Sequence, residues 1–180
     1  ARGRRPLVPM GAQHAMGGQQ FLDGGLVLDC ALLDRIEQFD DRCGLVTVEA
    51  GIRWPRLLDW LQWHPANTRR WTVRQKQTGG DNFSLGGSIA ANIHGRVLGR
   101  GPLVDDIEWL ELIDASGERR RLSRDQDRER FAHVVGGYGL FGLVTRVCLR
   151  LTPDQTLQRE VSLERSGRLM QAFDEAIARG

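Results

Sequence analysis

Residues 75–96 read QKQTGGDNFSLGGSIAANIHGR, and this stretch decides which kind of fold the chain adopts. It is long, rich in glycine and alanine, and apolar in its middle, so it does not have the composition of a solvated linker. A loop of this kind inside a domain is expected to wrap a ligand. Gly86, Gly87, Ala90 and Ala91 would let the backbone lie close to a large flat molecule. His94, taken alone, fits a structural histidine as well as a ligand contact.

The overall composition restricts how such a ligand is held. The chain has 180 residues, 25 Lys plus Arg, 23 Asp plus Glu and a net charge of +2, which suits one domain or two small lobes. Glycine is in excess at 22 residues, whereas Lys76 is the only lysine. Because Gln77 follows Lys76 and no glycine precedes it, the chain has no Walker A phosphate loop. Because Lys76 is the only lysine, an enzyme that forms a Schiff base with a lysine is not expected either.

Charge and cysteine patterns exclude several other classes of protein. Arginines alternate with acids, as in residues 125–130 (DQDRER), so no basic nucleic-acid-binding face is expected. No apolar run reaches the length of a membrane span and no leader segment is visible. Cys30, Cys43 and Cys148 lack the spacing of a zinc site and are expected to be reduced, buried residues. We therefore expect a soluble, cytoplasmic protein with no nucleic-acid partner and no membrane span.

The remaining sequence predicts an α+β fold of short strands, few helices and glycine turns. Apolar or alternating runs predict strands, and apolar residues at helical spacing predict helices. Trp54 to Leu61 has a proline in its first turn and then meets Pro65, which predicts a short helix. The expected strands are 7–10, 26–29, 45–49, 107–115, 118–122, 142–151 and a strand-like 157–163; the expected helices are 54–61, 128–135 and 166–180, the last with Ser166 as its N-cap.

Two more glycine-rich segments bear on function. Residues 9–20, PMGAQHAMGGQQ, directly follow a predicted strand. Successive backbone N–H groups in such a run can form an anion-binding nest, although the same run also suits a tight surface turn. Residues 136–142, GGYGLFG, contain a G-x-G-x-x-G pattern, but they follow a predicted helix and open a strand. The Rossmann fingerprint requires the reverse order, so this pattern does not indicate a Rossmann site.

Other enzyme classes find little support. There is no G-x-S-x-G elbow, no H-E-x-x-H motif and no paired-histidine spacing, so neither a hydrolase nor a metal site is expected. Asp105 and Asp106 are adjacent carboxylates, but their place before a strand favours loop capping over catalysis. The tryptophans of residues 54–71 belong either to the core or to an apolar surface for a partner.

Taken in order, these motifs resemble the FAD-binding (PCMH-type) domain of the vanillyl-alcohol oxidase and p-cresol methylhydroxylase flavoprotein superfamily. Residues 11–15 look like its pyrophosphate loop, and 45–52 like its V-x-x-G strand. Residues 84–95 look like its flavin-cradling loop, and 136–145 like its closing glycine-strand motif. The Ile-His-Gly form of the cradling loop is most similar to the decaprenylphosphoryl-ribose oxidase branch, with aldonolactone and alditol oxidases as further relatives.

The resemblance implies a set of cofactor-binding residues and no metal. Backbone amides of the first loop would hold the pyrophosphate, the second loop would line the rest of FAD, and the start of the last strand would close over it. In relatives the position of His14 carries a covalent bond to flavin. The decaprenylphosphoryl-ribose branch has no histidine there, and Ala15 replaces the usual serine, so covalent attachment stays open. The implied residues are Gly11, Ala12, Gln13, His14, Ala15, Thr78, Gly79, Ser84, Gly86, Gly87, Ser88, Ala91, Asn92, His94, Gly95, Leu143 and Val144.

The resemblance also implies an activity and a domain plan. A hydroxyl-bearing carbon of a sugar, polyol or sugar lactone, a small-molecule substrate, would pass a hydride to flavin N5 while a base takes the hydroxyl proton. That base normally lies in a C-terminal substrate domain, so no catalytic residue is assigned. Ile93 would crowd the path of dioxygen, which favours a quinone, dye or protein as the electron acceptor. A non-catalytic flavin-binding or interaction domain is the alternative.

We accordingly expect a two-lobed FAD-binding domain of small mixed sheets flanked by helices, as an N-terminally truncated fragment. Residues 1–74 would form the first lobe, residues 75–153 the second lobe, and residues 154–180 the start of the substrate or cap domain.

Overall fold

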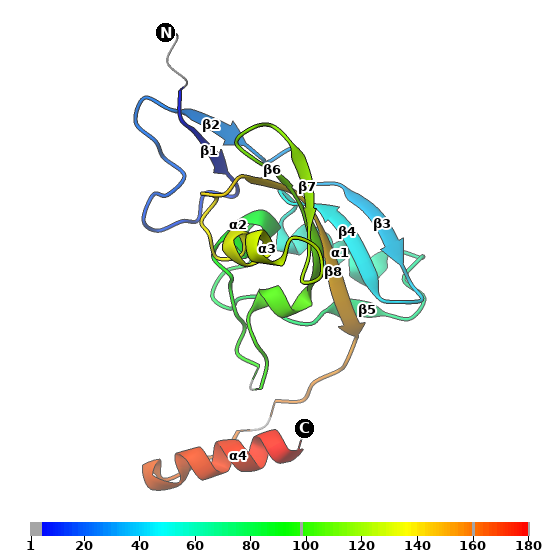
Figure 1. The fold of residues 1–180 in the computed structure, drawn as a ribbon. Helices are drawn as coiled ribbons and strands as arrows, with labels where there is room; N and C mark the ends of the chain where they lie inside the picture. Colours follow the sequence, from blue (N-terminus) through cyan, green and yellow to red (C-terminus); the bar gives the residue numbers. More distant parts are fainter. Residues whose placement is uncertain (1–4, 98, 160, 180) are drawn as a thin grey trace.

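The computed structural model describes residues 5–97, 99–159 and 161–179, and it confirms the α+β class (Figure 1). Two sheets are present in this part of the chain, one of two strands and one of six. In chain order the elements are β1 (Leu7–Met10), β2 (Leu26–Asp29), β3 (Ile36–Asp40), β4 (Leu45–Glu49), α1 (Trp54–Trp63), β5 (Trp71–Val73), α2 (Leu85–Ala90), η1 (Leu103–Asp106), β6 (Ile107–Ile113), β7 (Arg119–Leu122), α3 (Arg128–Val134), β8 (Leu143–Pro153), η2 (Ser166–Arg168) and α4 (Leu169–Arg179).

The small sheet holds the first glycine-rich loop. β1 and β2 pair in parallel, with Leu7 opposite Leu26 and Met10 opposite Asp29. Parallel neighbours cannot be joined by a tight hairpin, so a long connection has to run from the end of β1 back to the start of β2. That connection contains the predicted anion-binding loop.

β8 is the central strand of the large, antiparallel sheet. It pairs with β4 on one side and β6 on the other, and its end pairs with β5. Val147 lies opposite both Val48 and Leu110, and all three are fully buried. Every second residue of β8 points to the opposite face of the sheet. On that face Arg146 forms ion pairs with Glu37 (2.8 Å) and Glu111 (3.0 Å). β8 therefore carries an apolar row toward the core and a charged row away from it.

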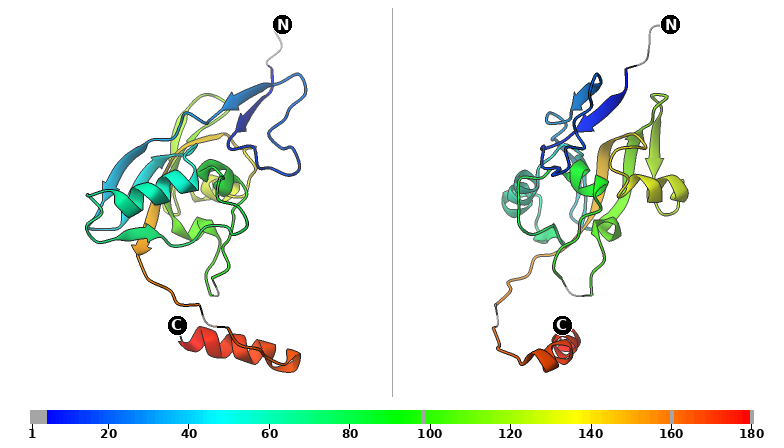
Figure 2. Two further views of the ribbon diagram at one scale, coloured as in Figure 1. Left: turned by 180° about the vertical axis from the view of Figure 1, so that it is seen from behind. Right: turned by 90° about the vertical axis from the view of Figure 1, so that its left-hand side faces the viewer.

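Helices α1 and α3 pack on the apolar face of this sheet. The buried residues of α1 and α3 belong to one core cluster with Val48, Leu110 and Val147, which share that face. Figure 2 shows α1 lying across the sheet. α1 has Pro55 in its first turn, buries Trp54, Leu57 and Leu61, and ends where the His64 N–H donates to the Trp60 carbonyl (2.9 Å), one residue before Pro65. It extends two residues beyond the predicted end.

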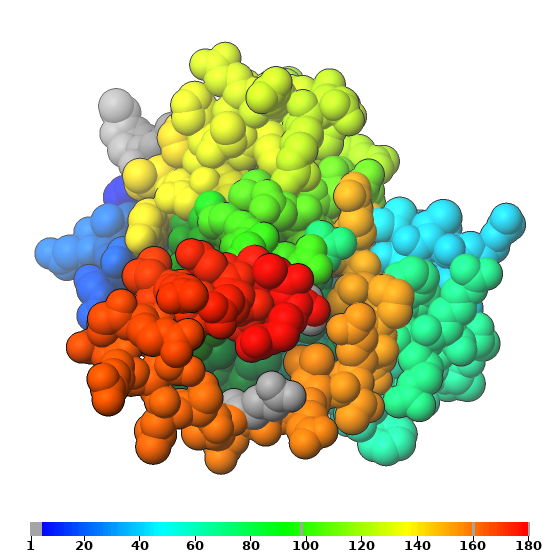
Figure 3. Space-filling view, turned by 90° about the horizontal axis from the view of Figure 1, so that it is seen from below, coloured from blue at the N-terminus to red at the C-terminus, as the bar shows by residue number. Residues whose placement is uncertain are grey.

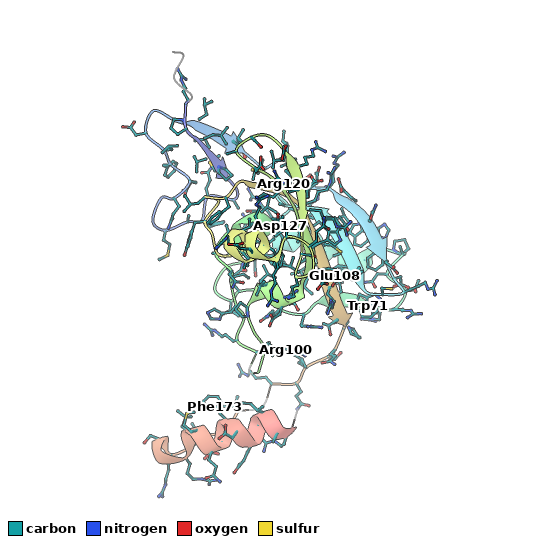
Figure 4. All side chains as sticks on the ribbon, viewed as in Figure 1. Trp71, Arg100, Glu108, Arg120, Asp127 and Phe173 are labelled. Atoms are coloured by element: carbon teal, nitrogen blue, oxygen red, sulfur yellow. The ribbon has the colours of Figure 1, made fainter. Side chains whose placement is uncertain are left out.

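The C-terminal part differs from the prediction. No strand forms among the described residues of 157–163, because no neighbouring strand pairs with them. Ser166 starts a 3₁₀ turn and not the helix, and the first helical residue of α4 is Leu169. Figure 1 shows α4 set apart from the sheets at the end of an extended segment, and in Figure 3, seen from below, α4 lies in front of the rest of the chain. Its apolar residues, including Phe173 (labelled in Figure 4), are partly or largely exposed.

Four elements were absent from the sequence prediction: β3, β5, α2 and η1. Strands from both sides of the expected boundary between residues 74 and 75 share the large sheet, since β3 and β4 join β8; the division into lobes stays a prediction. No helix in the described ranges is long and apolar enough to cross a membrane.

Individual side chains correct further expectations. Cys30 and Cys148 are buried, but Cys43 is exposed, because it lies in the turn between β3 and β4. Trp54 is buried and Trp63 exposed. The other two tryptophans of this region are half-buried against the core, so the four do not form one apolar surface.

Candidate functional site

The loop after β1 presents unused backbone donors. Among the described residues, no backbone hydrogen bond has an N–H group of residues 11 to 17 as its donor. Gln13 has a left-handed backbone (φ +60°), the kind of local reversal from which N–H nests are built. A Cβ on Gly11 would lie 2.2 Å from Ser84 Oγ, so this loop approaches the second glycine-rich segment as closely as glycine allows. The loop is suited to an anion and lies against α2.

The helix α2 contributes a surface of small residues and no free donors in its first turn. The side chain of Ser84 caps it, accepting from the Gly87 N–H at 3.3 Å. The N–H of Leu85 donates to the Ile52 carbonyl (2.8 Å) and that of Gly86 to the Ala50 carbonyl (2.6 Å). These bonds explain why a segment containing two adjacent glycines is helical. They also mean that α2 offers a close approach and leaves anion binding to the first loop.

The third segment closes the site from the other side. The N–H of Gly136 donates to the Ile89 carbonyl (2.9 Å), and that of Tyr138 to the Ala90 carbonyl (3.0 Å), so the segment is anchored on α2. α3 ends at Val134 and β8 begins at Leu143, which confirms that these glycines link a helix to a strand. A Cβ on Gly139 would lie 3.0 Å from a side-chain carbon of Pro9, so the segment also touches β1.

Two connected cavities lie between these three segments. The larger holds about 430 Å³ and the smaller about 100 Å³. Both are lined by Pro9, Gly11, Ser84, Gly87, Ala90 and Tyr138, so they form one trough. The larger volume lies within the usual range of small-molecule sites.

The lining of the trough is nearly uncharged. It contains no Lys, Arg, Asp or Glu, and His14 is its one histidine. The His14 ring lies 4.7 Å from the Phe83 ring, centroid to centroid. Burial raises the pKa of the Cys30 thiol, which lines the smaller cavity. An anion in this trough would be held by backbone dipoles, because no Lys or Arg side chain lines it.

Two glutamines in the wall were not expected from the sequence. Gln20 is 8% exposed, and its carbonyl oxygen has no hydrogen-bond partner among the described residues. The carbonyl oxygen of Gln77 is also buried without a partner, while its amide group donates to the Gly80 carbonyl (3.1 Å). Buried acceptors of this kind are costly unless a ligand or water donates to them. No sequence motif marked either residue as special.

Most of the residues expected to bind FAD line the trough. These are Gly11, Ala12, Gln13, His14, Ala15, Ser84, Gly86, Gly87, Ser88, Ala91, Leu143 and Val144.

Thr78, Gly79, Asn92, His94 and Gly95 lie outside the lining. The Asn92 side chain accepts a hydrogen bond from the Val104 N–H (3.2 Å), which is a structural role. His94 is exposed, with Nδ1 2.9 Å from the carbonyl of Gly95. The part of these residues in cofactor binding stays a prediction.

Asp106, one of the two adjacent carboxylates noted in the sequence, does not line the trough. It is buried in η1, 3.2 Å from the Arg74 guanidinium, and burial raises its pKa. Within the described ranges no group of three or more His, Cys, Asp or Glu residues could hold a metal ion.

The residues present fit FAD on structural grounds. The free N–H groups of the first loop suit a diphosphate, the small residues of α2 admit a flat ring, and the two unpartnered glutamine oxygens can accept from ligand N–H or O–H groups. All three features border the same trough.

Comparison with known proteins identifies the family. A family model described as "FAD binding domain" matches residues 1–123. The chain is 31% identical to decaprenylphosphoryl-beta-D-ribose oxidase of Mycolicibacterium smegmatis, over 86% of this chain and 33% of the relative. It is 30% identical to cytokinin dehydrogenase 7 of Oryza sativa subsp. japonica (88% and 30%) and 29% identical to the rice L-galactono-1,4-lactone dehydrogenase 2 (82% and 24%). The chain thus spans about a quarter to a third of these relatives' length. With its trough, its order of motifs and this match, the chain belongs to the FAD-binding domain family of the PCMH-type flavoproteins, and its cofactor is FAD.

Proposed function

We propose that this chain is the FAD-binding part of a flavin-dependent oxidoreductase that oxidises a hydroxyl-bearing carbon of a sugar, polyol or sugar lactone. The observation that carries the FAD site is the row of unused N–H groups at residues 11 to 17, beside an uncharged trough. The substrate class rests on two relatives, whose names refer to a ribose derivative and a lactone. The name cytokinin dehydrogenase refers to a different substrate, so the substrate class needs its own test.

The residues of the chain divide the work of binding. Backbone amides of Gly11 to Ala15 hold the pyrophosphate, and the small residues of α2 let the cofactor lie against the helix. Leu143 and Val144 close the far side. Bound FAD supplies the hydride acceptor, while these uncharged walls keep water from it and orient it for the substrate carbon. No base is assigned among the described residues.

Covalent attachment of the flavin through His14 is a separate question. The His14 ring lines the larger cavity and packs against Phe83, which leaves both modes of binding open. Acid precipitation of the purified protein distinguishes them, because covalent flavin stays with the pellet and dissociable flavin stays in solution. The His14→Ala variant should lose the colour of the pellet if the bond is to this residue.

Two measurements test the main proposal. Purified protein should be yellow or should bind added FAD with a saturable change in flavin fluorescence; a colourless protein that ignores FAD would contradict the FAD site. The full-length flavoprotein, kept without air, should then lose its oxidised flavin absorbance on addition of a polyol or aldonolactone. Bleaching by cytokinins alone would contradict the proposed substrate class, and bleaching by no donor would favour a non-catalytic flavin-binding or interaction domain.

A further inference from the structure

Tyr138 has a backbone conformation that its side chain makes unfavourable. Its φ is +50°, in the left-handed region that bulky L residues rarely occupy. Glycine would adopt this conformation without strain, and glycines stand on both sides of it at Gly137 and Gly139. Strained residues of this kind persist where the surrounding structure holds them, and they concentrate at functional sites.

The strain is imposed by the segment around Tyr138. Its N–H is bonded to the Ala90 carbonyl, and the N–H of Gly136 is bonded to the Ile89 carbonyl. A Cβ on Gly137 would lie 2.2 Å from the His133 carbonyl oxygen, so the backbone turns tightly at this point. Yet no polar or aromatic contact among the described residues holds the Tyr138 side chain. It is 58% exposed, and none of the described residues forms a hydrogen bond or an aromatic pair with it.

Tyr138 is among the residues that line both cavities. Five described non-glycine residues have a positive φ, and Tyr138 is the one among them that lines both cavities. The larger cavity is the one with the free amides of the first loop. The smaller, about 100 Å³, has a lining that includes Ala50, Val134, Leu143 and Val144. A ligand that occupies both cavities lies beside the residues that line both, and Tyr138 is the one aromatic residue among them.

FAD has the chemistry to occupy both. Its diphosphate lies between two flat ring systems, adenine and the three-ring isoalloxazine. If the free amides hold the diphosphate, the two ring systems extend from it in opposite directions along the trough. The smaller cavity then admits adenine, the smaller of the two, and the isoalloxazine lies in the larger cavity. Aromatic side chains stack on adenine with a substantial gain in affinity.

We propose that Tyr138 is a specificity residue whose ring stacks on the adenosine end of FAD, so that the site prefers FAD over flavins that lack adenosine monophosphate. This inference rests on the proposed FAD site and adds a residue to it. It explains why a strained tyrosine occupies a position where glycine would fit the backbone without strain. The phenol hydroxyl has no part in the contact.

The test compares affinities for FAD and FMN, since FMN has the same flavin ring and no adenosine. Dissociation constants are measured by flavin fluorescence in a His14→Ala background, so that a covalent bond at His14 cannot hide a change. The FAD-to-protein ratio of the purified proteins that keep His14, with and without the Tyr138 substitutions, gives a second readout. Tyr138→Asn removes the ring with a residue that tolerates positive φ, and Tyr138→Phe keeps the ring. Asp127→Gly is the matched control, because Asp127 has a similar backbone (φ +53°), lies at the start of α3 (Figure 4) and lines neither cavity.

Tyr138→Asn should weaken FAD binding about tenfold and FMN binding less than twofold, with a thermal midpoint no lower than that of the parent. Tyr138→Phe and Asp127→Gly should keep FAD affinity within about twofold. Equal losses for FAD and FMN, an unchanged FAD affinity in Tyr138→Asn, or an equal loss in Tyr138→Phe would each overturn the inference. If neither the parent nor the wild type takes up FAD, the proposed function fails instead.

Discussion

Replacing Gly87 with alanine should separate cofactor binding from fold stability. Gly87 lies in α2 and lines both cavities, and a Cβ built there meets only Ser84 Oγ, at 3.0 Å. Alanine is favoured over glycine inside a helix by about 0.5–1 kcal/mol. This gain is partly offset because the Ser84 hydroxyl has to move by a few tenths of an ångström. The apoprotein should therefore unfold at an unchanged or slightly higher temperature, with about 2–4 °C expected per kcal/mol. The added methyl group also occupies the surface against which FAD would lie. Inserting a methyl into a fitted contact costs about 1–3 kcal/mol, so FAD affinity should fall about 5- to 150-fold.

The neighbouring glycine provides the matched control. A Cβ on Gly86 would lie 3.0 Å from the Ala50 carbonyl oxygen and 3.2 Å from the Ala50 Cβ, and neither atom can move aside easily. Gly86→Ala should lower the free energy of unfolding by about 1–3 kcal/mol. Thermal unfolding and FAD titration of the two variants give the comparison. A Gly87→Ala protein with normal stability and normal FAD affinity would show that the cofactor does not lie on α2.

Three further predictions follow from the described side chains. Under native conditions a thiol reagent should modify Cys43 first, because the other two cysteines are buried with raised pKa values; mass spectrometry of briefly labelled protein would reveal the order, and equal labelling of all three would contradict it. A hydrogen bond from the Arg35 guanidinium, 2.8 Å away, is the main reason why the pKa of the buried Glu49 is lowered from its usual value of 4.5. The ionised Glu49 therefore stabilises the fold above about pH 4.5, and this contribution is lost as the pH falls through the lowered pKa. Glu49→Gln should therefore be less stable at neutral pH and lose less stability on acidification, and parallel curves for variant and wild type in denaturant titrations at several pH values would refute this. Finally, Ile93 lines the larger cavity, and Ile93→Gly should speed reoxidation of the reduced full-length protein by air; rapid reoxidation of the wild type with no effect of the variant would contradict a quinone, dye or protein acceptor.

Strands whose apolar residues are dense were predictable from the sequence. β1, β2 and β4 begin and end at the predicted residues, since each is a short apolar or alternating run. β3 was missed because it has apolar residues only at Ile36 and Phe39, and a register irregularity between Ile36 and Gln38 breaks its alternation. Its strand conformation depends on pairing with β4. The run at 157–163 shows the converse, since its pattern suits a strand but no partner lies beside it.

The candidate site was predicted where backbone chemistry carries the signal. The glycine and alanine runs marked the loop of Gly11 and the segment of Gly87, and both line the trough. Gln20 and Gln77 could not be found in this way, because glutamine is common on surfaces and only burial leaves their oxygens without partners. The same holds for Tyr138, whose backbone strain is a property of the folded segment.

The sequence by itself predicted the family and the cofactor, because its motifs resemble those of the FAD-binding domain in kind and order. It also marked the three glycine-rich segments that line the trough, because glycine lets the backbone approach a ligand closely. Tertiary structure decided how those segments meet. The N–H groups of Leu85 and Gly86 donate to the carbonyls of Ile52 and Ala50, and these bonds hold the glycine-rich segment in a helix. In the first loop, by contrast, the backbone N–H groups of residues 11 to 17 have no backbone acceptor among the described residues. Anchoring of the third segment on Ala90 places Tyr138 where it lines both cavities. Such contacts join residues far apart in the chain, so no local pattern could have revealed them.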